Sequence, residues 1–136
     1  MKLRFEIPYP PSDVGRREWT RLYGLNGYYG NRVNYHERTR AIHVLHELVQ
    51  LRMRKAGIPK QAVTEPVTVT FHWNDRLDID NHAIMGKAIV DAMKGWVLPD
   101  DNRRWLVGVS HRFWDGEDVL VEVETAEGGN VTCKLP

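Results

Sequence analysis

Two adjoining segments with different periods constrain the fold of this chain most strongly. Residues 66–73 (P-V-T-V-T-F-H-W) alternate apolar and polar side chains, which predicts a strand with one buried face. Residues 81–94 place apolar side chains three and four positions apart, which predicts a helix with Asp80 as its N-cap and Gly95 just after its end. A strand that leads directly into a helix indicates a domain that mixes both kinds of structure.

The same two periods predict the remaining elements. A capping box that starts at Asn34 begins a second helix, and Gly57 ends it. The other expected strands are residues 2–8, 104–114, 118–125 and 130–136. The expected order is strand, helix, strand, helix and then three strands. We therefore expect one α+β domain over residues 1–136, with a mixed sheet and two helices.

The composition and the opening residues limit the cellular compartment in which such a domain could function. The only cysteine, Cys133, excludes an internal disulfide and is typical of a reducing compartment. No run approaches the ~18 consecutive apolar residues of a membrane span. The opening residues M-K-L-R-F-E-I-P alternate charged and apolar side chains and are not a signal peptide. We expect a soluble cytoplasmic protein without a membrane partner.

The charge of the chain is divided unevenly between its two halves. Residues 1–60 contain 12 Lys and Arg against 5 Asp and Glu, whereas residues 61–136 contain 7 against 13. A basic half is suited to a polyanion, because Lys and Arg release counterions from phosphates. A solvated helix face is the alternative explanation. The candidate DNA-binding residues are Arg16, Arg17, Arg21, Arg32, Arg38 and Arg40.

Two pairs of aspartates flank the helix expected at 81–94. Along the end of a strand, residues two apart point the same way, so Asp78 and Asp80 can face one point. Asp100 and Asp101 follow the helix, and both pairs can lie at one edge of the sheet. Four converging carboxylates repel unless a cation bridges them, and oxygen ligands favour Mg²⁺. Helix capping and solvated turns are the alternative.

Lys87 lies on the helix between the two acidic pairs. It follows Asp80 by seven residues and returns to nearly the same helix face, about 10 Å along the axis. Its flexible stem could reach back toward a phosphate, although a surface lysine is an equal alternative. Metal-bound carboxylates can activate a water and stabilise the charge that grows on a phosphodiester.

The combination of D-I-D-N (78–81), K-A-I-V-D-A-M-K-G (87–95) and P-D-D (99–101) resembles the RusA family of Holliday-junction resolvases of phages and prophages. The opening strand with P-Y-P-P-S and the stretch N-R-V-N-Y-H-E-R-T-R are also similar to that family. The resemblance covers most of residues 3–113. This chain has its lysine seven residues after the second aspartate where the family has it at four. It also has His82 where an aliphatic residue is usual.

The resemblance implies a homodimeric, Mg²⁺-dependent endonuclease that nicks four-way DNA junctions in recombination and repair. It implies that Asp78, Asp80 and Asp101 are metal ligands and catalytic residues, with Asp100 as the alternative to Asp101. It assigns a catalytic role to Lys87 as well. Mn²⁺ could replace Mg²⁺. The alternative function is a non-catalytic accessory protein that binds branched DNA.

Overall fold

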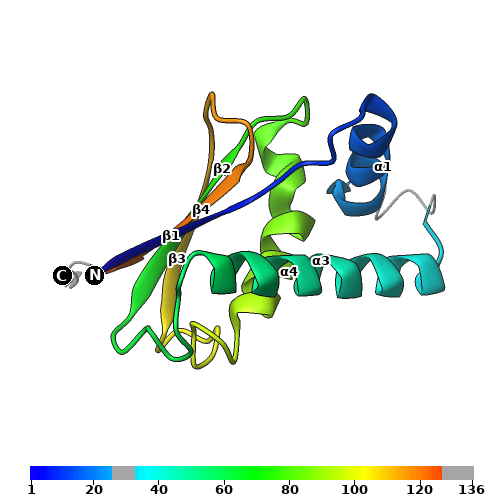
Figure 1. The fold of residues 1–136 in the computed structure, drawn as a ribbon. Coiled ribbons are helices and arrows are strands. Elements are labelled where there is room, and N and C mark those ends of the chain that lie inside the picture. Colours follow the sequence, from blue (N-terminus) through cyan, green and yellow to red (C-terminus); the bar gives the residue numbers. More distant parts are fainter. Residues whose placement is uncertain (26–32, 127–136) are drawn as a thin grey trace, which may run out of the picture.

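The structure, a computed structural model, describes residues 1–25 and 33–126 and is an α+β fold with a four-stranded mixed sheet. The α-helices lie to one side of the sheet (Figure 1). The elements are β1 (Lys2–Ile7), α1 (Asp13–Tyr23), α3 (Tyr35–Lys55), β2 (Val67–Trp73), the 3₁₀ turn η1 (Ile79–His82), α4 (Ala83–Met93), β3 (Leu106–Phe113) and β4 (Val119–Thr125). No helix in these two ranges combines the length and apolar character of a membrane span.

The order of the strands in the sheet is β1-β4-β2-β3. β4 pairs antiparallel with both β1 and β2, whereas β3 pairs parallel with β2, placing Val69 beside Val109 and Phe71 beside His111. Parallel neighbours need a crossover, which η1 and α4 provide. The corner after β2 therefore lies at one end of the strands, and the loop that leads into β3 lies at the other.

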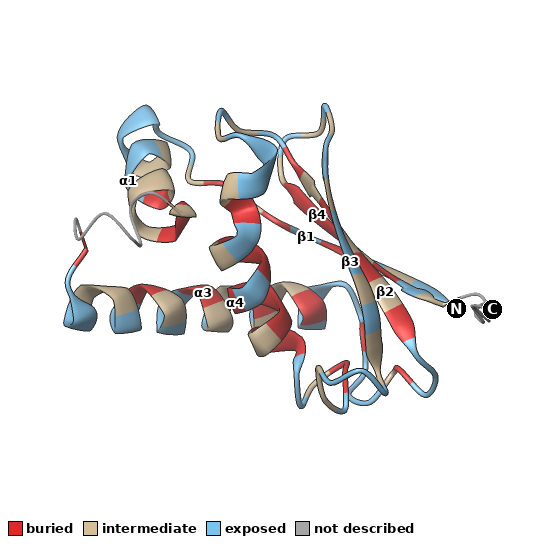
Figure 2. Ribbon diagram, turned by 180° about the vertical axis from the view of Figure 1, so that it is seen from behind, coloured by how far each residue is buried: buried red, intermediate tan, exposed pale blue. Residues whose placement is uncertain are grey.

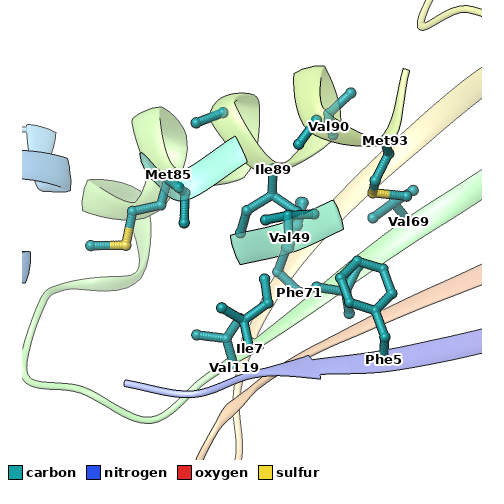
Figure 3. Packing of buried hydrophobic residues seen from close by; sticks show 14 of the residues in the cluster. Phe5, Ile7, Val49, Val69, Phe71, Met85, Ile89, Val90, Met93 and Val119 are labelled. Atoms are coloured by element: carbon teal, nitrogen blue, oxygen red, sulfur yellow. The ribbon is translucent and has the colours of Figure 1, made fainter. Parts of the chain in front are cut away.

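The core lies between the sheet and helices α3 and α4. The strand β2 alternates buried and half-buried residues along its whole length, as its sequence predicts. Figure 3 shows Val69 and Phe71 of β2 facing Val49 of α3 and Ile89 and Met93 of α4. Each large apolar side chain buried in this way contributes about 1.5–3 kcal/mol relative to an exposed one.

The helix α1 is absent from the sequence prediction, which expects two helices where the described residues form three α-helices. Ser12 caps it by accepting a hydrogen bond from the backbone N–H of Gly15 at 2.9 Å. Trp19 and Tyr23 lie one turn apart on its buried face, with ring centroids 4.8 Å apart. The strand expected at 130–136 lies outside the described residues.

Candidate active site

The corner after β2 is held in place by the carboxylate of Asp75. Its Oδ1 accepts a hydrogen bond from the backbone N–H of Leu77 at 3.1 Å, and its Oδ2 accepts one from the Tyr9 hydroxyl at 2.9 Å. The Tyr9 oxygen in turn accepts a hydrogen bond from the backbone N–H of Asn74 at 2.9 Å. The turn is thus connected to the segment that follows β1, far away in the sequence.

His82, which is fully buried, also belongs to this hydrogen-bond network. Its Nε2 lies 2.8 Å from Oδ1 of Asp75, and its Nδ1 lies 3.0 Å from the carbonyl oxygen of Ile79. Both ring nitrogens therefore face acceptor oxygens. Burial alone would raise the pKa of Asp75, but the hydrogen bond and charge of His82, together with the Tyr9 hydroxyl, hold that pKa below its usual value.

Aromatic rings support His82 against the sheet. Trp73 stacks on its imidazole with a centroid separation of 4.5 Å, and Trp73 Nε1 donates a hydrogen bond to Nδ1 of His111 at 3.0 Å. Burial, followed by the charge of His82, lowers the pKa of His111. A neutral His111 can accept the Trp73 hydrogen bond, which fixes the indole ring under the corner.

Asp78 and Asp80 project from this fixed corner into solvent. Asp78 is the extended residue before η1 (φ −62°, ψ 152°), and Asp80 lies in the first turn of η1. The prediction that Asp80 is the N-cap of the helix is therefore wrong. Strand alternation does not align the side chains of Asp78 and Asp80 either, because Asp80 lies in a 3₁₀ turn. Both residues are exposed, and their side chains form no hydrogen bond or ion pair with any other described residue. Their oxygens are free to bind a cation.

The second acidic pair is held by a lysine that the sequence analysis missed. Lys94 Nζ lies 3.5 Å from Oδ1 of Asp100 and 3.6 Å from Oδ1 of Asp101. The charges of Asp101 and Asp100 raise the pKa of Lys94. The only signal for this contact in the sequence is a lysine at the expected end of the helix, six residues before Asp100.

The two acidic pairs do not meet within the chain. The helix α4 has 11 residues and separates them by about 16 Å along its axis. The expected convergence at one edge is wrong, because a parallel crossover places the start and the end of its helix at opposite ends of the strands. Residues 1–25 and 33–126 contain no group of three or more His, Cys, Asp or Glu side chains arranged to hold a metal.

Lys87 lies two turns along α4 from the corner. Its Nζ is 3.3 Å from Oδ1 of Asp91, one turn further toward the C-terminus of the helix. With Tyr35 and Ile84 it lines a groove of about 350 Å³ between α3 and α4. In this conformation its ammonium group points away from Asp80.

Two of the candidate arginines lie near the corner. Arg16 and Arg17 line a cavity of about 380 Å³ together with Asp75 and Arg76. The guanidinium carbon of Arg16 lies 4.5 Å from the centroid of the Tyr9 ring. The structure therefore brings basic side chains from α1 beside the turn that presents Asp78 and Asp80.

The other arginines lie further away or are already paired. Arg21 forms ion pairs with two glutamates, and its Nη2 is 2.6 Å from Oε2 of Glu37. Arg38 donates a hydrogen bond to a backbone carbonyl at 3.0 Å, and Arg40 is exposed on α3. Arg32 lies outside the described residues.

Comparison with known proteins does not place the chain in a family. No protein-family model matches it. An acyclic carotenoid 1,2-hydratase of Rubrivivax gelatinosus is 37% identical over 59 residues. That match covers 37% of this chain and 14% of the hydratase, so the chain spans a small part of the length of the relative it matches. So short a match carries no activity over to this chain.

Proposed function

We propose that this chain is a cytoplasmic, RusA-like endonuclease that resolves four-way DNA junctions with Mg²⁺ and acts as a homodimer in recombination and repair. The observation that carries the proposal is the free carboxylates of Asp78 and Asp80 on a fixed corner beside a cavity lined by arginines. The motif that these residues share with that family supports the same conclusion.

The chemistry of the corner suits phosphodiester hydrolysis. Exposed carboxylate oxygens are the ligands that Mg²⁺ and Mn²⁺ accept, and such ions keep waters and bind substrate phosphate as well. The bound metal would supply an activated water and offset the charge that grows on the phosphodiester. Arg16 and Arg17 are placed to hold a neighbouring DNA phosphate. A surface that only binds DNA would gain nothing from the free carboxylates, because without a metal they repel phosphate.

Asp101 can join this site only through a second copy of the chain, since α4 separates it from Asp80 within the protomer. The proposed homodimer meets this need if the corner of one protomer faces the acidic loop of its partner. Lys94 already orients the Asp100 and Asp101 carboxylates there. For a catalytic role, the Lys87 ammonium would have to leave Asp91 and turn toward the DNA.

The test is cleavage of a labelled synthetic four-way junction in Mg²⁺ or in EDTA. We expect metal-dependent nicks from the wild type and at least about a 100-fold lower rate from Asp80→Asn, with junction affinity retained. Glu47→Gln is the matched control, because it removes a carboxylate from the exposed face of α3. Equal rates for Asp80→Asn and Glu47→Gln would contradict the proposal.

A non-catalytic protein that binds branched DNA is the second candidate. The observation that favours it is the lack of a three-ligand metal group among the described residues of the protomer. Tight junction binding without nicks in Mg²⁺ or Mn²⁺ would support this candidate. In that case Asp78 and Asp80 would serve only in the turn into α4.

A further inference from the structure

The cavity of about 380 Å³ between α1 and the corner after β2 is larger than a single ion needs. Cavities of roughly 300–1,000 Å³ hold small ligands, so there is room for a nucleotide. Figure 2 shows α1 with exposed residues in its first turns and buried residues toward its other end. The lining accordingly combines exposed charged side chains with two buried aromatic ones, Tyr9 and Trp19.

Three arginines line this cavity and have few partners in the protein. Arg17 of α1 and Arg76 of the corner are exposed, and their side chains form no hydrogen bond or ion pair with another described residue. The Arg16 guanidinium lies over the Tyr9 ring and likewise has no hydrogen bond or ion pair among residues 1–25 and 33–126. Each guanidinium therefore offers its N–H donors, which suit phosphate oxygens.

One free carboxylate opposes the three arginines. Asp13 is exposed in the first turn of α1. The other carboxylate of the lining, that of Asp75, accepts hydrogen bonds from Tyr9 and Leu77 and contacts His82, so its oxygens are engaged within the protein. Three arginines against Asp13 leave a surplus of two positive charges. A phosphate monoester carries about −1.5 to −2 at neutral pH and matches this surplus, whereas an internal phosphodiester carries a single charge.

The indole of Trp19 supplies an independent observation that points to a ligand. Trp19 is 7% exposed, and its Nε1 has no hydrogen-bond partner within the described part of the chain. Its ring packs edge-on against Tyr9 and Tyr23, with centroid separations of 5.7 and 4.8 Å. A phenylalanine ring could make the same contacts, so packing does not explain the N–H group. A buried N–H without an acceptor costs free energy, which a ligand oxygen in the cavity would recover.

We propose that this cavity binds a phosphate monoester, at the end of a nucleic acid strand or on a free nucleotide. Arg17 and Arg76 donate to the phosphate oxygens from opposite walls, Arg16 adds its charge, and the Trp19 N–H donates to a further oxygen of the ligand. The choice of a nucleic acid rests on the proposed function.

The proposed hydrolysis would itself produce such a group beside the cavity. Water adds to the phosphorus, one phosphorus–oxygen bond breaks, and the departing oxygen takes up a proton. One new strand end then carries a hydroxyl and the other carries a phosphate monoester. The cavity would hold the phosphorylated end after a nick at the corner.

The test is isothermal titration calorimetry of the full chain in EDTA, where metal-dependent cleavage cannot occur. The probes are a short single-stranded oligonucleotide with hydroxyl ends and the same strand phosphorylated at its 5′ or its 3′ end. We expect at least one phosphorylated form to bind about tenfold more tightly than the unphosphorylated strand. Equal affinities for all three would overturn the proposal. Thymidine monophosphate distinguishes the sources, because affinity equal to that of the phosphorylated strand indicates a free nucleotide and weaker affinity indicates a strand end.

Substitutions in the lining test where the phosphate binds. Arg17→Gln and Arg76→Gln should each lower the affinity for the phosphorylated strand on the order of tenfold. Arg103→Gln, at an exposed arginine that does not line the cavity, is the matched control and should stay within about twofold of the wild type. Equal affinities of Arg17→Gln and Arg103→Gln would overturn the site.

Trp19→Phe tests the indole N–H separately, because it keeps an aromatic ring on the buried face of α1. We expect it to lower the affinity for the phosphorylated strand about fivefold and to leave the unphosphorylated strand unaffected. Circular dichroism would verify that the variant is folded. Wild-type affinity in a folded Trp19→Phe variant would overturn the role of this residue.

Binding in EDTA separates this inference from the proposed function. A protein that prefers the phosphorylated strand but cuts no junction would keep the cavity assignment and contradict the nuclease. A protein that cuts junctions with equal affinity for the phosphorylated and unphosphorylated strands would contradict the cavity assignment alone.

Discussion

At the scale of residues, the pair formed by His82 and Asp75 determines the shape of the corner. The side chain of His82 is fully buried and that of Asp75 is 9% exposed. Such a pair stabilises the fold little compared with apolar residues of the same size, but removing one partner leaves an uncompensated charge in the interior. The main role of the His82–Asp75 pair is therefore to fix the position of the turn that carries Asp78 and Asp80.

Replacing His82 with leucine, the kind of residue usual at this position in the family it resembles, should destabilise this chain. We expect His82→Leu to lower the free energy of unfolding by about 3 kcal/mol, because the Asp75 carboxylate stays buried without its partner. Urea denaturation would measure the change. His43→Leu, at an exposed histidine paired with Glu47, should stay within about 0.5 kcal/mol of the wild type. Equal losses for the two variants would contradict the burial argument.

The lowered pKa of Asp75 predicts how stability changes with pH. The folded state favours the carboxylate, so the contribution of Asp75 is complete at neutral pH. It is lost as the pH falls below the usual carboxyl value of 3.8. Asp75→Asn should therefore be less stable than the wild type at pH 7, and the two should converge below about pH 4. A difference in unfolding free energy that stays constant from pH 7 to 3 would contradict this assignment.

At the scale of elements, local periodicity was sufficient for some predictions. The N-cap at Asn34 is confirmed, since its Oδ1 accepts a hydrogen bond from the backbone N–H of Glu37 at 2.8 Å, whereas the Glu37 carboxylate pairs with Arg21. The buried alternation of β2 is confirmed along all seven residues. Both elements carry their whole signal in neighbouring residues, so no information about the tertiary fold was needed to find them.

Other elements depend on contacts that local sequence does not encode. The helix α1 buries only Trp19 and Tyr23, so its apolar face is too narrow to stand out from the glycine- and arginine-rich residues around it. The separation of the two acidic pairs follows from the parallel pairing of β2 and β3. Strand direction is a property of the sheet, so the sequence could supply the candidate ligands but not their distance.

Gly86 marks the closest approach of α4 to the sheet. A Cβ at this position would lie 2.9 Å from His111 Cε1 and 3.3 Å from Phe71 Cε2. The better helix propensity of alanine, worth up to about 1 kcal/mol, opposes an overpacking cost of about 1–3 kcal/mol. We expect Gly86→Ala to lower the free energy of unfolding by about 1 kcal/mol, measured by urea denaturation. A higher free energy of unfolding would show that α4 packs less tightly against the sheet than these contact distances indicate. Lys87→Ala, on the exposed face of α4, is the control.

At the scale of the whole molecule, the two acidic pairs of the chain lie apart. The corner offers Asp78 and Asp80 at one end of α4, and the acidic loop offers Asp101 at the other end. In the proposed homodimer, the corner of one protomer and the acidic loop of its partner would together form a complete site, twice by symmetry. Two sites related by a two-fold axis suit a four-way junction, which has the same symmetry and needs paired cuts.

Mixing two inactive variants tests whether the sites are shared between protomers. Asp80→Asn and Asp101→Asn should each lose cleavage, but a mixed dimer would keep one site with both aspartates intact. We expect an equimolar mixture to recover single nicks on junction DNA, at roughly a quarter of the wild-type site concentration for random assortment. A mixture as inactive as its components would show that each site is built within one protomer.

Mapping the nicks on an immobile four-way junction, with each of its four strands labelled in turn, tests the proposed junction cleavage most directly. A linear duplex of the same sequence is the control substrate. We predict Mg²⁺-dependent nicks at symmetric positions in two opposed strands, none in the duplex and none with Asp80→Asn. Bound but uncut junctions in both Mg²⁺ and Mn²⁺, or equal cutting of junction and duplex, would contradict the proposed function.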